Sequence, residues 1–242
     1  MTLKEKRNDA RYINGINYNG NTKLQPTENV RFWIWNLPAV TTCPFATEAC
    51  KKCCYACKAE KMYPSVLPRR MENYETSRRA DFAERMIYTI ETELNTKAAQ
   101  GKKIVFRIHE SGDFYDFQYY AAWVRIAAYF VSDPRIIFIA YTKSVPFTVL
   151  LKAPKNLVVR ASIWCDTTPE NEEISRANYP IYTAYDRETI DAMRASGLQI
   201  ETIETIDGWK AHAEFFMCRC SDCGTCGACY NPEIREIFCI IH

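Results

Sequence analysis

The sequence has no hydrophobic run approaching the roughly 18 apolar residues of a membrane-spanning helix, so we expect no membrane partner. Its first residues, MTLKEKRNDARYINGINYNGN, are polar and lack the apolar core of a secretory signal, so we expect a cytoplasmic protein. The net charge is only +2, which excludes an overall attraction to nucleic acid. The basic stretch PRRMENYETSRR at 68–79 leaves a local nucleic-acid contact open, although a solvated helix face is the more common role of such a stretch.

Cysteine, in contrast, is abundant, and ten of the twelve cysteines fall in two short segments. These segments are CPFATEACKKCCYACK at 43–58 and CRCSDCGTCGAC at 218–229. Adjacent cysteines and a C-x-C step are poor geometry for separate disulfides but suit convergence on one ion or cluster. The clustering therefore predicts a reduced metalloprotein. Cys165 and Cys239 lie apart from both segments, and we interpret them as small buried apolar residues.

Between the cysteine segments, strand and helix patterns alternate. Apolar β-rich runs predict strands at 30–38, 102–109, 135–142, 156–164, 179–186 and 198–204, and helical periodicity predicts helices at 73–100, 115–131, 169–177 and 187–196. This alternation predicts an α/β fold with a parallel sheet, either open or forming a partial (βα) barrel. We expect one barrel-like domain over residues 1–206, with a cluster loop at 43–57, and a cysteine-rich extension over residues 207–242.

Polar residues follow several of these strands, and in parallel α/β folds the carboxyl ends of the strands carry the functional groups. The first cysteine segment, the run His109–Asp113 and the run 141–144 should therefore share one rim. His109 and Asp113 are candidate catalytic residues. A buried structural imidazole is the alternative for His109, and a helix N-cap is the alternative for Asp113. Lys143 and Arg160 can receive a carboxylate or phosphate, or they can be solvated or salt-bridged.

Thiolates at these spacings suit either zinc or an iron–sulfur cluster. Three consecutive C-x2-C steps in the C-terminal segment favour a [4Fe–4S] cluster, with zinc as the alternative; the candidate ligands there are Cys218, Cys220, Cys223, Cys226 and Cys229. The N-terminal segment offers two sets, because Cys43 can replace one member of C-x3-C-x2-C. The candidate ligands there are Cys43, Cys50, Cys53, Cys54 and Cys57. A cluster held by three thiolates keeps one iron open to a small molecule.

A strand followed by C-x3-C-x2-C and a helix resembles the opening of the radical SAM enzymes. Ser111-Gly112-Asp113-Phe114 is similar to the turn of that superfamily that holds the methionine end of S-adenosylmethionine (SAM), and IIFIAYTKS resembles its next strand. The resemblance implies that Ser111, Gly112 and Asp113, with Thr142 and Lys143, bind SAM. It also implies that a second, auxiliary cluster follows the barrel, and that a donor such as flavodoxin or ferredoxin supplies electrons.

The implied reaction is the reductive cleavage of SAM, which starts hydrogen abstraction from a substrate that the sequence does not identify. Two other classes stay open. One is an iron–sulfur protein without SAM that acts as Lewis acid or electron carrier, and the other is a zinc-stabilised module that binds nucleic acid or protein. The Cys-Tyr-Ala and His-x-Ser-Gly-Asp-Phe motifs also resemble a group of phage-encoded proteins of unassigned function, which implies location in a host cytoplasm.

Overall fold

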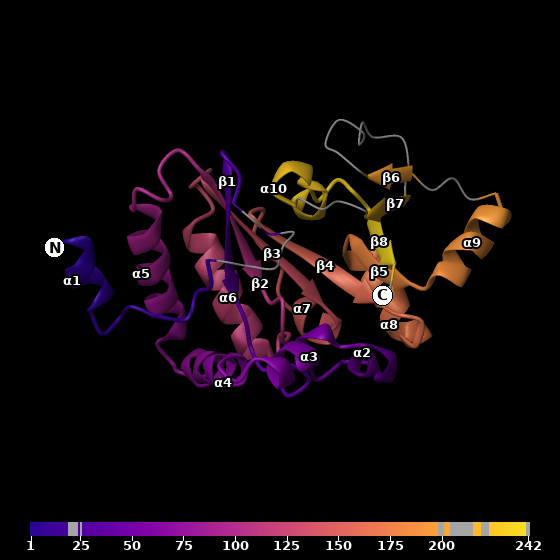
Figure 1. Cartoon of the computed structure of the whole chain (residues 1–242), viewed down its shortest axis with the longest axis horizontal. Helices are drawn as coiled ribbons and strands as arrows, with labels where there is room; N and C mark the ends of the chain where they lie inside the picture. The colour runs from indigo at the N-terminus through magenta and orange to yellow at the C-terminus, as the bar shows by residue number, and fades with distance from the viewer. Residues whose placement is uncertain (19–23, 25, 198–200, 204–214, 219–222, 241–242) are drawn as a thin grey trace.

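Eight parallel strands form a single sheet in the computed structural model (Figure 1). The structure describes residues 1–18, 24, 26–197, 201–203, 215–218 and 223–240. The strands follow the order β1-β2-β3-β4-β5-β8-β7-β6, and every neighbouring pair is parallel. Their bounds are β1 Val30–Trp35, β2 Lys103–Ile108, β3 Ile136–Thr142, β4 Leu157–Ile163, β5 Ile181–Tyr185, β6 Glu201–Ile203, β7 Phe215–Cys218 and β8 Glu236–Ile240. The predicted α/β class with a cysteine-rich C-terminal region is confirmed.

Two of these strands were not predicted from the sequence. Both β7 and β8 come from residues after 207, where the sequence predicts a cysteine-rich extension. Strand β8 pairs with β5 on one side and with β7 on the other. The second cysteine segment therefore lies in a connection between two strands of the main sheet.

Helices connect the strands, and α5 and α6 cover one face of the sheet. They are α1 Leu3–Arg7, α2 Glu48–Lys52, α3 Tyr55–Met62, α4 Val66–Ser77, α5 Phe82–Leu94, α6 Phe117–Tyr129, α7 Val145–Thr148, α8 Pro169–Asn178, α9 Arg187–Ala195 and α10 Cys223–Cys226. The helix predicted over 73–100 is in fact two helices, α4 and α5. The chain turns between them at 78–81, where Arg79 pairs with Asp81 at 2.8 Å, and the regular apolar period begins only at Phe82. Among the described residues, no helix is both long and apolar enough to span a bilayer.

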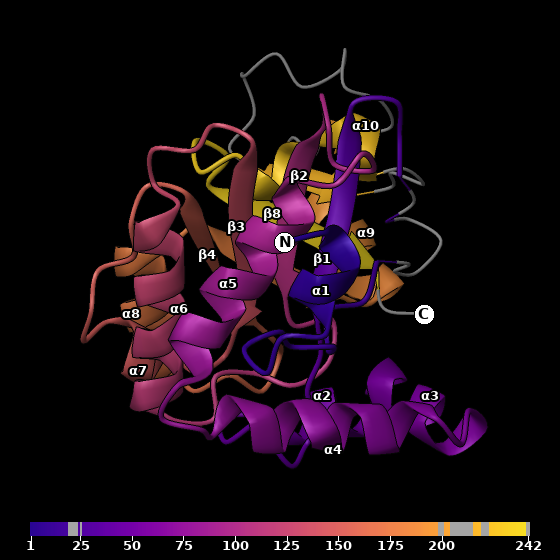
Figure 2. The ribbon, with the colours of Figure 1, turned by 90° about the vertical axis from the view of Figure 1, so that its left-hand side faces the viewer.

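Alternation along the strands divides the core between the two faces of the sheet. Trp35, Phe106 and Phe138 point toward α5 and α6 and belong to the main core. Phe32, Val105 and Ile139 lie on the opposite face, where the C-terminal cysteine segment packs against them. Figure 2 shows α5 and α6 on one side of the sheet and α10 on the other. We refer to the face that meets α10 as the inner face.

Helices α2, α3 and α4 lie across the carboxyl ends of the strands (Figure 1). The loop after β1 leads directly into them and carries the first cysteine segment. The fold therefore delivers one cysteine segment to the strand-end rim and the other to the inner face of the same sheet.

Candidate functional site

The loop after β1 brings three thiols of the first segment together. Cys43, Cys50 and Cys54 interact electrostatically with one another. Burial raises the pKa of Cys43 to about 12, and the nearby Asp113 carboxylate adds to this increase. Burial also raises the pKa of Cys50, and the positive charge of Lys143 opposes the increase. The structure thus places three thiols beside one cation and one carboxylate.

The other two cysteines of this segment lie differently. Burial raises the pKa of Cys57 to about 11, and an electrostatic interaction with Cys54 adds to the increase. Cys53 is exposed. The grouping favours Cys43, Cys50 and Cys54 as a ligand set, with Cys57 next to it and Cys53 facing solvent.

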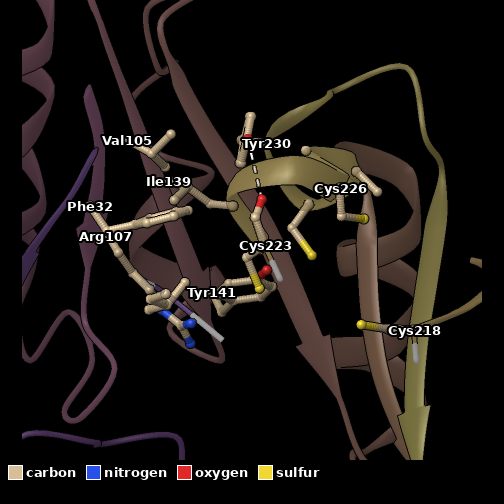
Figure 3. A pocket seen from close by; sticks show the side chains of 13 residues that line it. Phe32, Val105, Arg107, Ile139, Tyr141, Cys218, Cys223, Cys226 and Tyr230 are labelled. Carbon is tan, nitrogen blue, oxygen red and sulfur yellow. Dashed lines mark hydrogen bonds between the residues drawn. The ribbon is translucent and has the colours of Figure 1, made fainter. Parts of the chain in front are cut away.

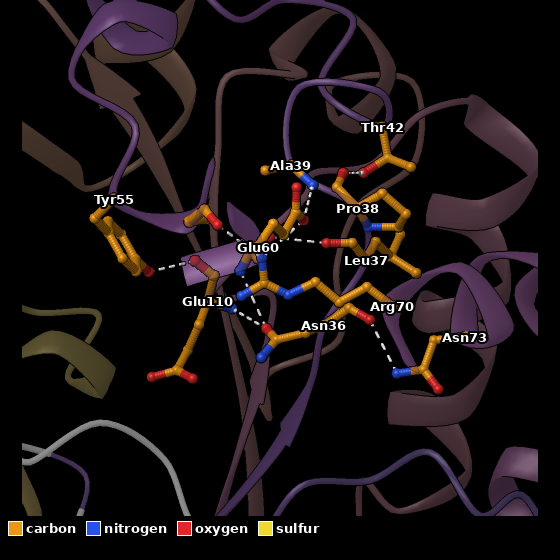
Figure 4. Close-up of polar contacts among 12 residues, drawn as sticks. Asn36, Leu37, Pro38, Ala39, Thr42, Tyr55, Glu60, Arg70, Asn73 and Glu110 are labelled. Atoms are coloured by element: carbon orange, nitrogen blue, oxygen red, sulfur yellow. Dashed lines mark hydrogen bonds and ion pairs between the residues drawn. The ribbon is translucent and has the colours of Figure 1, made fainter. Parts of the chain in front are cut away.

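Side chains from distant parts of the chain fix this loop. Asp166, after β4, accepts a 2.8 Å hydrogen bond from the Ala49 amide at the start of α2. Glu60 of α3 accepts a hydrogen bond from the Ala39 amide and pairs with Arg70 of α4, both at 2.8 Å (Figure 4). The side chains of Glu60 and Arg70 are only 12% and 10% exposed, so this ion pair is a buried link between the two helices.

The turn after β2 packs tightly against the chain after β1. Asn36 Oδ1 accepts hydrogen bonds from the amides of Glu110 and Ser111 at 2.8 and 3.0 Å (Figure 4). Ser111 Oγ donates to the Leu37 carbonyl at 2.8 Å. Gly112 has a φ of 88°, and a Cβ there would stand 2.6 Å from Leu37 Cβ. This position therefore requires glycine both for its conformation and for the close approach.

Asp113 joins the ends of β2 and β3. Its buried carboxylate accepts hydrogen bonds from Thr142 Oγ1 at 2.6 Å, from the Lys143 amide at 2.8 Å and from the Phe114 amide at 2.7 Å. Burial raises the pKa of Asp113, and these hydrogen bonds oppose the increase. Asp113 does not cap the following helix, because the N-cap of α6 is Asp116. Asp113 thus bridges the ends of β2 and β3.

His109 lies on the other side of the sheet from the inner face. Its Nε2 is 2.9 Å from the Tyr119 hydroxyl, and its ring packs edge-on against Phe114. Burial, with a smaller contribution from the charge of Arg107, lowers the pKa of His109 to about 3. The imidazole is therefore neutral and belongs to the layer between the sheet and α6, which corresponds to the structural alternative for this residue.

The second cysteine segment closes over the inner face. Cys218, Cys223, Cys226 and Cys229 line a pocket together with Tyr141 and Arg107 (Figure 3). Burial raises the pKa of Cys223 to about 12, and the charges of Cys229 and Cys218 add to the increase. Tyr141 interacts electrostatically with Cys229. Cys220, the fifth predicted ligand, lies outside the described residues.

Arg160 of β4 holds this segment in place. The side chain is fully buried and donates hydrogen bonds to four backbone carbonyls, those of Ala228, Cys229, Asn231 and Ile234, at 2.6–3.3 Å. Arg160 is thus neither solvated nor salt-bridged. In the sequence, the signal for such a residue is a basic side chain inside an apolar strand, as in LVVRASI and also KIVFRI, which contains Arg107.

The thiols suit some metal groups better than others. None of the eleven described cysteines forms a disulfide. In the described part of the chain, no three Cys, His, Asp or Glu side chains converge as ligands of a single ion must. Sulfurs around one tetrahedral zinc stand only about 3.8 Å apart, given Zn–S bonds of about 2.3 Å. Ligands of a cubane bind separate irons and stand further apart, so the short sulfur–sulfur distance that a single zinc ion requires does not apply to a cluster.

Fold and site together define an α/β protein with two thiol-rich segments on one parallel sheet. The chain belongs to the gene product 88 family, whose model matches residues 3–232. It is 32% identical over 204 residues to the gene 88 protein of Mycobacterium phage D29, and 28% identical over 203 residues to that of Mycobacterium phage L5. Each match covers 81% of both chains. No solved structure matches. The predicted resemblance to phage-encoded proteins is confirmed at the level of the family.

Proposed function

We propose that this protein is an iron–sulfur enzyme related in mechanism to the radical SAM enzymes. A [4Fe–4S] cluster would be held at the rim by Cys43, Cys50 and Cys54. The observation that carries this proposal is the electrostatic interaction among these three thiols, near Lys143, at the carboxyl ends of parallel strands. A cluster with three thiolate ligands supplies one electron and an open iron, at which SAM can be cleaved reductively.

The residues around the thiols would prepare them for this role. Thiolates are the ligands of iron, and a cation close to a thiol favours its ionised form. Lys143 provides this cation near Cys50, where its charge lowers the pKa of the thiol. Burial of Cys43 keeps water from the site and strengthens the electrostatic interactions within it. Lys143 Nζ donates to Ser162 Oγ at 3.1 Å, which orients the ammonium group.

A second cluster would be held on the inner face by Cys218, Cys223, Cys226 and Cys229, with Cys220 as a further candidate. These thiols surround a common pocket with Tyr141 and Arg107. We assign to this cluster electron relay, substrate anchoring or stabilisation of the fold. Electrons would come from a protein such as flavodoxin or ferredoxin, and, because the relatives are encoded by phages, the setting would be the host cytoplasm.

One observation favours a second candidate, an iron–sulfur protein that does not use SAM. The residues expected to hold the methionine end of SAM are occupied by internal contacts. Ser111 Oγ donates to the Leu37 carbonyl, and the Asp113 carboxylate already accepts three hydrogen bonds. In this candidate the rim cluster acts as a Lewis acid or electron carrier. A zinc-stabilised binding module is the third candidate, and elemental analysis distinguishes it.

The test is anaerobic purification and reconstitution, followed by iron and sulfide analysis and EPR or Mössbauer spectroscopy. We expect two [4Fe–4S] signals in the wild type. The variants Cys43→Ser, Cys50→Ser and Cys54→Ser should each lose the rim signal, whereas Cys53→Ser, the exposed control, should retain it. Formation of 5′-deoxyadenosine from SAM under reduction separates the first candidate from the second. Protein that binds zinc and no iron would refute both.

A further inference from the structure

Arg107 is a half-buried cation on the inner face, and it interacts electrostatically with the carboxylate of Glu110. It lies in β2, in register with Ile34 of β1 and Ile139 of β3. Among the described residues its guanidinium makes no ion pair with a carboxylate, and its one hydrogen bond runs from Nε to the His109 carbonyl at 3.3 Å. A guanidinium has five N–H donors, so its outer edge keeps unused donors.

The surroundings hold this guanidinium in a fixed orientation. Its central carbon lies 4.9 Å from the centre of the Tyr141 ring, a cation–π distance. Tyr141 in turn packs edge-on against Tyr182 at 4.9 Å and interacts electrostatically with Cys229. Stacking on an aromatic ring leaves the in-plane edge of the guanidinium available, and this edge matches the paired oxygens of carboxylate and phosphate.

The space next to Arg107 is otherwise apolar. The pocket of Figure 3 is lined by Phe32, Val105 and Ile139 on the sheet side and by the second cysteine segment on the other. Arg107 also interacts electrostatically with Tyr55 of the first cysteine segment and with Cys223 of the second. One oriented cation in an apolar pocket is the usual composition of a site that binds a small molecule with one charged group.

We propose that Arg107 is the anion-recognition residue of a binding site on the inner face, beside the second cysteine segment. The site would take a small molecule with one carboxylate or phosphate group, which the guanidinium binds through two N–H groups. The assignment of this molecule as the substrate rests on the proposed function, whereas its binding does not.

Calorimetric titration of the purified protein with benzoate, phenyl phosphate and benzamide tests the site. Benzamide has the shape of benzoate without its charge. We expect one of the two anions to bind and benzamide not to bind. Arg107→Met should weaken the binding by about tenfold or more, as expected for the loss of a charged hydrogen-bonded pair. Arg107→Lys keeps the charge without the planar pair of donors, so its affinity for the anion should lie between those of the wild type and Arg107→Met. Arg135→Gln, which alters an exposed pair with Asp133, should bind as the wild type does.

The relative affinity of the two anions identifies the group that the site prefers. Equal binding of benzamide, unchanged binding by Arg107→Met, or no binding of either anion to the wild type would overturn the proposal. If Arg107→Met left the binding unchanged, Arg107 would serve only as a counter-charge for the thiolates of Cys223 and Cys229. Iron is measured in the same samples. Protein that binds the anion but contains no iron would support the anion site and refute the iron–sulfur function. Protein that contains iron but does not bind the anion would support the iron–sulfur function and refute the anion site.

Discussion

The substitution Gly112→Ala tests how tightly the turn after β2 is built into the rim. Gly112 adopts a φ of 88°, and its ideal Cβ position is 2.6 Å from Leu37 Cβ and 2.7 Å from Thr42 Oγ1. Leu37 and Thr42 are fully buried, so neither can move aside into solvent. Leu37 is moreover fixed by a 2.9 Å hydrogen bond from its amide to the Ser111 carbonyl.

Two costs of this substitution add up. A left-handed conformation costs a residue with a Cβ about 1–2 kcal/mol. Insertion of a methyl group into a packed core costs about a further 1–3 kcal/mol. We therefore expect Gly112→Ala to lower the free energy of unfolding by about 2–5 kcal/mol, measured by guanidinium denaturation with tryptophan fluorescence.

Gly101→Ala is the matched control, because Gly101 has a φ of 70° and nothing within 4 Å of its ideal Cβ position. It should show only the conformational cost of about 1–2 kcal/mol. The difference between the two variants isolates the contact with Leu37 and Thr42. Equal losses in both variants would refute the reasoning, since they would mean that the turn yields at no cost.

Three further perturbations test the supports of the site. Arg160→Met removes the donor to four backbone carbonyls, so it should lower the free energy of unfolding by about 3 kcal/mol or more. It should also speed amide hydrogen exchange in residues 223–240, while α5 stays protected. Exchange as slow as in the wild type would contradict this role. Glu60→Gln leaves Arg70 buried without its counter-charge, so it should lower the free energy of unfolding by about 3–5 kcal/mol in a denaturation experiment. Glu72→Gln, which alters an exposed ion pair, should lower it by less than about 1 kcal/mol. Similar losses in the two variants would argue against a buried link. The pKa of His109 is about 3 in the folded chain and 6.5 in the unfolded chain, so the proton binds preferentially to the unfolded chain. The free energy of unfolding should therefore fall as the pH drops from about 6.5 toward 3, by up to about 1.4 kcal/mol per pH unit. The free energy of unfolding of His109→Gln should fall less steeply between pH 6.5 and 5 than that of the wild type. An unchanged slope would show that the imidazole binds its proton in the folded chain as readily as in the unfolded chain.

Most of the sheet could be predicted because its strands bury apolar residues on both faces. The runs at 102–109, 135–142 and 156–164 are continuous apolar patterns, and each became a central strand, β2, β3 and β4. Strands β7 and β8 are short and flank the cysteines, so their sequence offers less periodicity to detect. The position of β8 between β5 and β7 depends on long-range pairing, which no local pattern encodes.

The rim could be predicted for a different reason. Parallel strands end at the same edge, so residues after β2 and β3 had to meet the loop after β1, and Asp113 and Lys143 do lie beside Cys43 and Cys50. The partners of each side chain could not be predicted. Whether Asp113 caps a helix or bridges two strands depends on a displacement of three residues, and the observed cap is Asp116.

The position of the second cysteine segment links its two possible roles, in binding and in folding. The segment begins where β7 ends at Cys218 and leads into β8 at Glu236, so its conformation determines whether these strands can pair. It also covers Val105 and Ile139, which the inner face would otherwise expose to water. A metal group held by these thiols would therefore stabilise the edge of the sheet and at the same time close the pocket that contains Arg107. In the proposed function, the rim cluster and the pocket wall would then depend on different thiols.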